Sequence, residues 1–249
     1  MVSKQKIKFI RSLQIKKNRL AEQLFFVEGA KSVLELLGSE WPVAGVAATE
    51  EFIRENSTLL EVKGVELLEA SEAQLVQMGT FASNRGALAW APIPNAPESL
   101  PTAPWVLALD DIRDPGNLGT LLRIADWYGL HEIVCSTTTA ELYNPKVLHA
   151  SMGSFTRVKV WYQDLTEYLP ASQRPVYGAY LEGDNVHSLN FAERGVLLMG
   201  NEAQGIHPDL EALVTQKVHI PQFGGAESLN VASATAVICD NLRRNHPQL

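Results

Sequence analysis

The stretch 220–236 reads Ile-Pro-Gln-Phe-Gly-Gly-Ala-Glu-Ser-Leu-Asn-Val-Ala-Ser-Ala-Thr-Ala. It follows a short β-like run at 218–221 and passes through a glycine loop into a helix opened by Ser228 and Asn230. The helix starts with small residues, which let another backbone approach closely, and the glycines leave backbone N–H and C=O groups open to a ligand. The stretch therefore predicts a loop that cradles a nucleotide-like group.

Two earlier stretches come in a fixed order before this one. Residues 110–126 read Asp-Asp-Ile-Arg-Asp-Pro-Gly-Asn-Leu-Gly-Thr-Leu-Leu-Arg-Ile-Ala-Asp, and residues 197–206 read Leu-Leu-Met-Gly-Asn-Glu-Ala-Gln-Gly-Ile. With the third stretch they supply Asn-x-Gly-x-x-x-Arg, Gly-x-Glu-x-x-Gly and Glu-Ser-Leu-Asn. In this order the patterns resemble the three signature motifs of the SpoU/TrmH family, RNA ribose 2′-O-methyltransferases with a knotted SPOUT fold. The resemblance spans roughly residues 105 to 244.

Composition fits a soluble globular protein, with 46% hydrophobic and 20% charged residues in a chain of 249. No run of about 18 apolar residues occurs, so we expect no membrane span. The six histidines lack the paired spacing of a zinc site, so we expect no metal. Cys135 and Cys239 lie in apolar stretches, which favours buried thiols in a reducing cytoplasm. We therefore predict a cytoplasmic protein.

Charge is distributed unevenly along the chain, whose net charge is −7. Residues 1–20 hold seven basic and no acidic side chains, which leaves 14 basic and 28 acidic residues in the rest. Such asymmetry indicates a basic arm on an acidic body, although a solvated helix face is the alternative. We predict that the arm contacts RNA phosphates through Lys4, Lys6, Lys8, Arg11, Lys16, Lys17 and Arg19.

The first hundred residues alternate between strand-like and helix-like patterns and predict a small α/β unit with a partly parallel sheet. Strands are expected at 25–28, 43–48, 65–68 and 87–91, and helices at 30–37, 50–60 and 72–78. Five prolines then crowd into residues 92–104, which is typical of a linker. We therefore expect an N-terminal domain at 1–95, a linker at 96–104 and a second domain at 105–249.

The second domain is predicted to be an open, mostly parallel α/β sheet whose ligand lies beyond the carboxyl ends of the strands. Strands are expected at 105–109, 132–136, 157–161, 176–181 and 196–199, and helices at 118–128, 145–152 and 230–244. A C-terminal trefoil knot is implied only by the family resemblance. The N-terminal unit is similar to a ribosomal-protein-like RNA substrate-binding domain in the stretches 10–13, 25–29 and 84–89.

The family resemblance implies S-adenosylmethionine as the methyl donor, which brings an activated methyl group and requires no metal. The protein's contribution is then chiefly positioning and electrostatics. Backbone and apolar contacts to the donor are implied on the motif loops, at Gly200, Ile220, Leu229, Gly205 and Met199. Taken alone, the glycines could equally serve turns and the apolar residues could pack in the core.

Arg123 is the main catalytic candidate, with a surface salt bridge as its alternative. Free guanidinium is too weak an acid to act as a neutral base, so a bidentate grip on the target phosphate is the safer role. Asn117 could cap a helix or order the loop around Arg123. Glu202 could orient Arg123 or the RNA, or be a solvated carboxylate. Ser228 and Asn230 could cap a helix or line the site.

The resemblance implies an enzyme that methylates structured RNA. A separate N-terminal module favours ribosomal RNA over transfer RNA, and a catalytically silent RNA-binding or ribosome-assembly protein is the other alternative. A homodimer is expected from the family and from the small residues of the last helix, 230–244. His149 stands where many relatives carry arginine, so the choice of substrate is open, and the sequence does not name the modified nucleotide.

Overall fold

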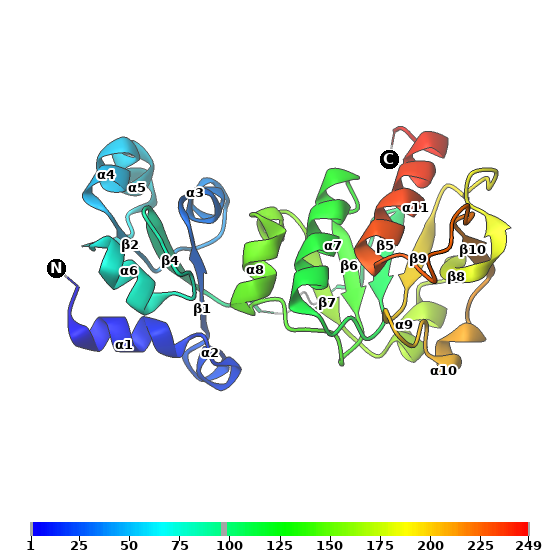
Figure 1. The fold of residues 1–249 in the computed structure, drawn as a ribbon, viewed down its shortest axis with the longest axis horizontal. Helices are drawn as coiled ribbons and strands as arrows, with labels where there is room; N and C mark the ends of the chain where they lie inside the picture. The colour runs from blue at the N-terminus through cyan, green and yellow to red at the C-terminus, as the bar shows by residue number, and fades with distance from the viewer. Residues whose placement is uncertain (1, 96–98, 249) are drawn as a thin grey trace. The chain divides into compact units, whose positions relative to one another are not determined.

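The computed structural model describes residues 2–95 and 99–248, which form two compact units (Figure 1). The first unit contains residues up to Asn95 together with Leu142–Thr156, and the second contains Ala96–Glu141 and Arg157–Leu249. The predicted boundaries gave residues 142–156 to the second domain, whereas they pack within the first unit. Residues 96–98 of the predicted linker lie outside the described residues.

The first unit is built on a four-stranded sheet with the order β1-β4-β2-β3. β4 pairs antiparallel with β1 and β2, and β2 pairs parallel with β3. A predicted helix at 50–60 is broken at Asn56 into α4 and α5. The elements are α1 (Lys4–Ser12), α2 (Lys16–Glu22), β1 (Leu24–Glu28), α3 (Ala30–Gly38), β2 (Gly45–Ala48), α4 (Glu50–Glu55), α5 (Ser57–Lys63), β3 (Glu66–Glu69), α6 (Glu72–Met78), β4 (Ala87–Pro92), α8 (Pro145–Ser151) and η1 (Ser154–Thr156).

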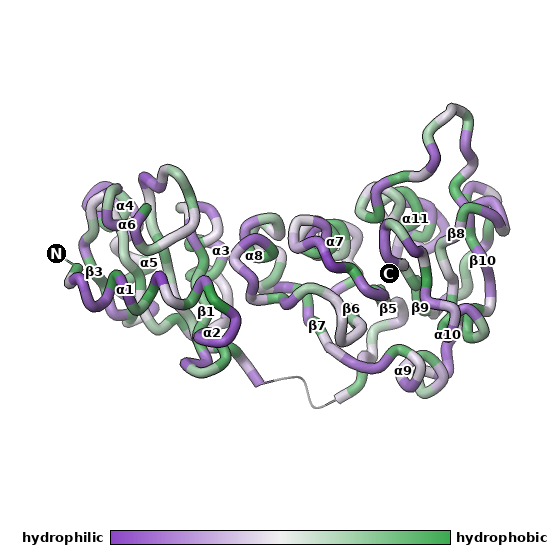
Figure 2. Tube along the Cα trace, turned by 60° about the horizontal axis from the view of Figure 1, so that its bottom comes forward, coloured by the Kyte–Doolittle hydropathy of each residue, from purple (hydrophilic) through white to green (hydrophobic). Residues whose placement is uncertain are grey.

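The basic arm forms two short helices, α1 and α2. The Ser3 side chain accepts a hydrogen bond from the Lys6 backbone and so caps α1. On the inner face, Ile10 and Leu13 are fully buried in a core shared with Leu75 of α6 and Trp90 of β4. The apolar residues of the arm therefore anchor it to the sheet, whereas five of its seven basic side chains are exposed. Figure 2 shows the hydrophilic positions along the trace of α1 and α2.

The segment 142–156 covers β1 with aromatic side chains. The Phe25 ring lies 5.0 Å from the Tyr143 ring and 6.1 Å from the Phe155 ring, measured between centroids. The Trp41 ring lies 5.6 Å from Phe155 in an edge-to-face arrangement. Phe25 and Phe155 are fully buried, so this segment completes a core that residues 1–95 leave open.

The second unit is built on a six-stranded sheet with the order β10-β8-β9-β5-β6-β7, in which every described strand pair is parallel. The predicted parallel α/β sheet is confirmed. The short helices α9 and α10 were not predicted. The elements are β5 (Trp105–Leu109), α7 (Pro115–Trp127), β6 (Glu132–Cys135), β7 (Lys159–Tyr162), α9 (Leu165–Ala171), β8 (Val176–Asn185), β9 (Gly195–Met199), α10 (Pro208–Glu211), β10 (Gln216–His219) and α11 (Val231–Asn245).

The central strands β5, β6 and β9 are buried along their whole length, which explains their continuous apolar sequences. Cys135 and Cys239 are buried, and burial raises the pKa of both thiols, so they behave as small apolar side chains. Helix α11 packs against α7. In the part of the chain that the structure describes, no helix combines the length and the hydrophobicity needed to cross a membrane.

Candidate functional site

The first turn of α7 places Asn117 inside the helix. The Asp114 carboxylate caps the helix by accepting a hydrogen bond from the Asn117 backbone at 2.8 Å, and Pro115 follows at the first helical position. The interpretation of Asn117 as a helix cap is therefore wrong. Its amide side chain is available for contacts outside the helix.

Two asparagine side chains and one glutamate side chain, one from each motif, are joined by hydrogen bonds. Asn117 Nδ2 donates to Glu202 Oε1 at 2.5 Å, across 85 residues of sequence. Asn230 Nδ2 donates to Asn117 Oδ1 at 3.0 Å, across 113 residues. Asn230 also caps α11 by accepting from the Ala232 backbone. The three predicted site residues are thus neighbours: Asn117 lies in the first turn of α7, Glu202 in the loop after β9, and Asn230 at the start of α11.

The segment 200–207, called the glutamate loop below, folds back tightly on itself. Asn201 and Gly205 exchange two backbone hydrogen bonds of 2.9 Å. A Cβ added at Gly200 would lie 2.3 Å from the Gly205 carbonyl carbon and from the Ile206 nitrogen. Gly200 therefore allows the backbone of the loop to approach closely, because a side chain at this position would clash with it. The sequence instead predicts that Gly200 leaves backbone exposed for contact with the donor.

Two consecutive aspartates in the turn after β5 fasten the glutamate loop, Asp110 through its carboxylate and Asp111 through its backbone carbonyl, which accepts from Asn201 Nδ2 at 2.8 Å. Asp110 is 6% exposed and accepts a hydrogen bond from the His207 backbone at 2.8 Å. Burial raises the pKa of Asp110, against the opposing hydrogen bond and charge of His207. Asp111 Oδ1 accepts from Arg113 Nε at 2.9 Å. Burial acts to raise the pKa of Asp111, but hydrogen bonds from Arg113 and Thr138 outweigh it and lower the pKa.

Arg123 lies on the exposed surface of α7. Within the described residues, no hydrogen bond or ion pair joins it to another side chain, so its guanidinium is available to a ligand. Ser228 is likewise exposed, and it forms no hydrogen bond with another of the described residues. It does not cap α11, because the N-cap is Asn230, two residues further on. The structure therefore does not bring Arg123 or Ser228 into contact with the Asn117–Glu202–Asn230 chain.

The residues expected at the donor differ widely in exposure. Met199 is buried at the end of β9, opposite Leu109 of β5. Ile220 is half-buried, Leu229 is 52% exposed and Gly205 has a left-handed φ of 71°. Residues 222–230, called the open loop below, are exposed throughout, with Phe223 at 93%. Exposed backbone and apolar side chains after parallel strands fit an adenosine-containing donor.

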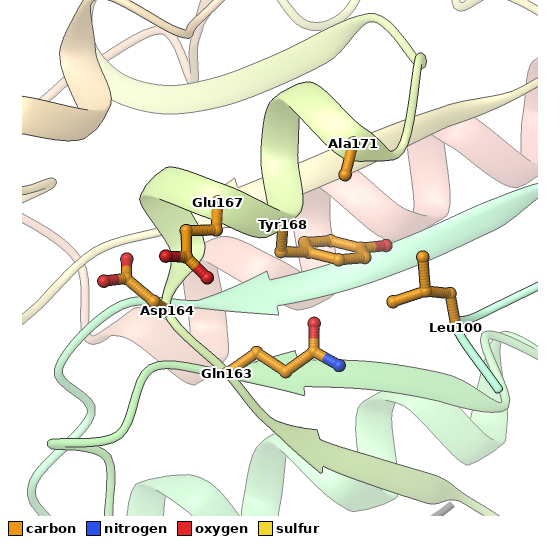
Figure 3. Close-up of a pocket in the computed structure, with 6 residues that line it drawn as sticks. All are labelled: Leu100, Gln163, Asp164, Glu167, Tyr168 and Ala171. Atoms are coloured by element: carbon orange, nitrogen blue, oxygen red, sulfur yellow. The ribbon is translucent and has the colours of Figure 1, made fainter. Parts of the chain in front are cut away.

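A separate hollow of about 410 Å³ lies beside α9 in the second unit (Figure 3). It is lined by Leu100, Gln163, Asp164, Glu167, Tyr168 and Ala171. The Tyr168 hydroxyl is buried without a hydrogen-bond partner among the described residues, and burial raises its pKa to about 12. None of the sequence-predicted site residues lines this hollow.

No cluster of histidine, cysteine and acidic side chains that could hold a metal ion occurs within residues 2–95 and 99–248. Sequence reasoning missed Asp110, Asp111 and Asn201 as the residues that shape the glutamate loop. The available signal was an asparagine directly after Gly200, since asparagine side chains commonly bond to the backbone two residues on.

Comparison with known proteins supports the motif assignment. Residues 104–240 match the SpoU rRNA Methylase family, and residues 4–89 match the MRM3-like substrate binding domain. The 23S rRNA (guanosine(2553)-2′-O)-methyltransferase RlmP of Bacillus subtilis is 33% identical over 243 residues, which cover 96% of each chain.

Solved structures resemble the chain over nearly its whole length. One, from Porphyromonas gingivalis and assigned to the TrmH family of RNA methyltransferases, is 35% identical with a TM-score of 0.85, and the match covers 98% of this chain and 99% of that one. The AdoMet-bound rRNA methyltransferase of Sinorhizobium meliloti is 26% identical with a TM-score of 0.87, and the match covers 99% and 97%. The likeness extends over both units and all three motifs, and the chain belongs to the SpoU rRNA methylase family.

Proposed function

We propose that this protein transfers the methyl group of S-adenosylmethionine to a ribose 2′-hydroxyl of ribosomal RNA. The observation that carries the proposal is the hydrogen-bonded chain of Asn117, Glu202 and Asn230, in which the three family motifs meet. Relatives named as 23S rRNA 2′-O-methyltransferases, among them RlmP of Bacillus subtilis, support the reaction and the class of RNA. Transfer RNA is the second candidate, because a solved tRNA-modifying TrmH/SpoU enzyme shares the fold over 59% of this chain.

S-adenosylmethionine supplies an activated methyl group on sulfur. The protein would hold it through Gly200, Gly205, Ile220, Leu229 and Met199, with Leu229 and the backbone of the open loop offering the exposed surface. Gly200 contributes indirectly, since the backbone of Gly205 and Ile206 occupies the space that a side chain at position 200 would fill.

In this proposal Arg123 binds the phosphate of the target nucleotide and orients the 2′-hydroxyl. A guanidinium keeps its proton at neutral pH, so it stabilises the negative charge that develops as the hydroxyl loses its proton. That proton leaves by way of a phosphate oxygen and passes to water. Its exposure and its lack of a described protein partner support this role. Asn117, Glu202, Asn230 and Ser228 would order the loops on either side of the reacting ribose.

The first unit is proposed to bind the RNA, as the match to a substrate binding domain supports. Lys4, Lys8, Arg11, Lys16 and Lys17 are exposed on α1 and α2 and are retained as phosphate contacts. Arg19 is removed from this set, because it is buried and donates to the Leu13 and Gln14 carbonyls at 2.9 Å. Lys6 is a weaker candidate, because it pairs with Glu66 at 2.8 Å.

A trefoil knot is proposed for the C-terminal connection. β10 pairs with β8, whereas α11 packs against α7, so the open loop runs back past β8 and β9 toward β5. We also propose a homodimer that uses α7 and α11, supported by the small residues of α11 and by Trp127, which is 83% exposed on α7. Experimental density for the open loop tests the knot, and sedimentation equilibrium tests the dimer.

The enzyme is proposed to act in the cytoplasm, where ribosomal RNA is found.

The test of function is methylation in vitro with S-adenosylmethionine in the presence of a chelator, with ribosomal and transfer RNA in parallel. Mapping of 2′-O-methyl sites in cells with and without the gene then identifies the nucleotide. We expect one ribosomal site to be lost in the deletion. Incorporation of the methyl group into transfer RNA alone would identify transfer RNA as the substrate. Absence of methyl transfer, together with absence of donor binding at millimolar concentration, would contradict the enzyme assignment.

A further inference from the structure

Asn201 lies at the start of the glutamate loop and bonds in three directions. Its backbone exchanges two hydrogen bonds with Gly205. Its side-chain Oδ1 accepts from the backbone nitrogens of Ala203 at 2.9 Å and Gln204 at 3.2 Å. Its Nδ2 donates to the Asp111 carbonyl at 2.8 Å. One amide side chain therefore ties the residues after Glu202 to the turn that follows β5.

The Asp111 turn is shaped to receive this bond. Asp111 has a left-handed φ of 55°, a conformation that aspartate tolerates better than most residues. Its nitrogen donates to Ser136 Oγ at 2.8 Å, and its carboxylate is held by Arg113. With the turn fixed on both sides, its carbonyl is a rigid anchor for Asn201.

Glu202 itself is exposed, and its hydrogen bond to Asn117 is the contact that joins it to α7. An exposed glutamate loses side-chain entropy when it is held in one place, so the contact depends on a loop that brings the carboxylate to the amide in advance.

We propose that Asn201 is a positioning residue for methyl transfer, which holds the Glu202 carboxylate against Asn117 by fastening the glutamate loop to the Asp111 carbonyl. The inference rests on the proposed methyl transfer only for its activity readout. Asn201 does not need to touch substrate or donor, because its effect passes through Glu202.

The test uses Asn201→Asp in the full-length protein. Aspartate has the same shape and keeps the acceptor for the Ala203 and Gln204 nitrogens, but it cannot donate to Asp111 and adds a negative charge beside it. Asn185→Asp is the matched control, since the Asn185 Oδ1 also accepts from a backbone nitrogen two residues on, that of His187, outside the site. Both changes are made in the wild-type and in the Glu202→Ala background.

We expect Asn201→Asp to lower the single-turnover rate about 10-fold in the wild-type background, the scale of a modest misplacement, and to change it little when Glu202 is already absent. Asn185→Asp should leave both rates unchanged. Equal losses in both backgrounds, or no loss in either, would overturn the proposal. If the variant folds poorly, Asn201→Ser replaces it in the same cycle.

A second readout needs no activity. The side-chain amide resonances of Asn117 report its hydrogen bond to Glu202, and Asn201→Asp should shift them in the direction that Glu202→Ala does. Unchanged Asn117 resonances would overturn the positioning role. Failure of the wild-type protein to methylate any RNA would contradict the proposed function and leave this test intact.

Discussion

The two loops that meet at Asn117 are held in very different ways. The glutamate loop is fastened at both ends by Asp110 and Asp111 and closed by an internal bridge. The open loop is exposed over its whole length, and its described side-chain hydrogen bonds are those of Gln222 within the loop and of Asn230 at its end. The contrast teaches that one motif supplies a fixed carboxylate, whereas the other leaves backbone and apolar surface available to a ligand.

Arg123 lies outside both loops, so its removal should change the rate of methyl transfer without disturbing the structure of either loop. Arg123→Ala should lower methyl transfer by on the order of 10²-fold or more, the scale of lost electrostatic help in the transition state. Arg123→Lys should restore little, because an ammonium lacks the planar fork of a guanidinium. Single-turnover methylation and donor titration separate the two steps. Wild-type turnover in the alanine variant would make Arg123 a surface residue only.

Matched glycine substitutions test the contrast between the loops directly. Gly200→Ala places a Cβ 2.3 Å from the backbone of Gly205 and Ile206, and this overpacking should cost about 1–3 kcal/mol of unfolding free energy. Gly224→Ala in the open loop meets no atom within 4 Å and should not lower that free energy. Urea denaturation of both variants gives the answer. Equal destabilisation would remove the distinction between a fastened and an open loop.

The sequence predicted both sheets and several elements closely, because continuous apolar runs and helix caps are local signals. The bounds of β5 and α6 match the predicted 105–109 and 72–78, and the family assignment is confirmed. The burial of Arg19 was not predicted, because the amino-acid sequence does not show whether an arginine side chain faces water or donates to backbone carbonyls, as Arg19 does. The packing of residues 142–156 against Phe25 also escaped, since it depends on tertiary contacts far apart in the chain.

The contrast between held and free groups recurs on α1, where two lysines lie two residues apart. Lys6 pairs with Glu66 and lies 4.6 Å from the centroid of the Trp90 ring, whereas Lys8 is exposed. A phosphate contact releases counterions, so Lys8→Ala should weaken RNA binding a few-fold and lower the logarithmic salt slope by about 0.7–0.9. Lys6→Ala is the control and should change the slope less. Equal slopes for both variants and the wild type would indicate a solvated helix face.

The smallest expected effect concerns the buried anchor of the glutamate loop. Because burial raises the pKa of Asp110 above its ordinary value of 3.8, the folded state binds its proton more tightly than the unfolded state does. Stability therefore falls as pH rises from that value through the raised pKa, and it falls no further above it. Asp110→Asn keeps an oxygen for the His207 nitrogen and cannot ionise, so this part of the decline should disappear.

Urea unfolding of both proteins between pH 4 and pH 8 isolates the contribution of the Asp110 charge and of its interactions with His207 and Asp111, since the rest of the chain is identical in the pair. The stability of the asparagine variant relative to the wild type should grow with pH across the acidic window and then stay level. A constant difference at every pH would mean that Asp110 ionises in the folded protein as it does in water. In that case the hydrogen bond from His207 would offset the whole cost of burial, and the glutamate loop would be fastened without any penalty from its buried charge.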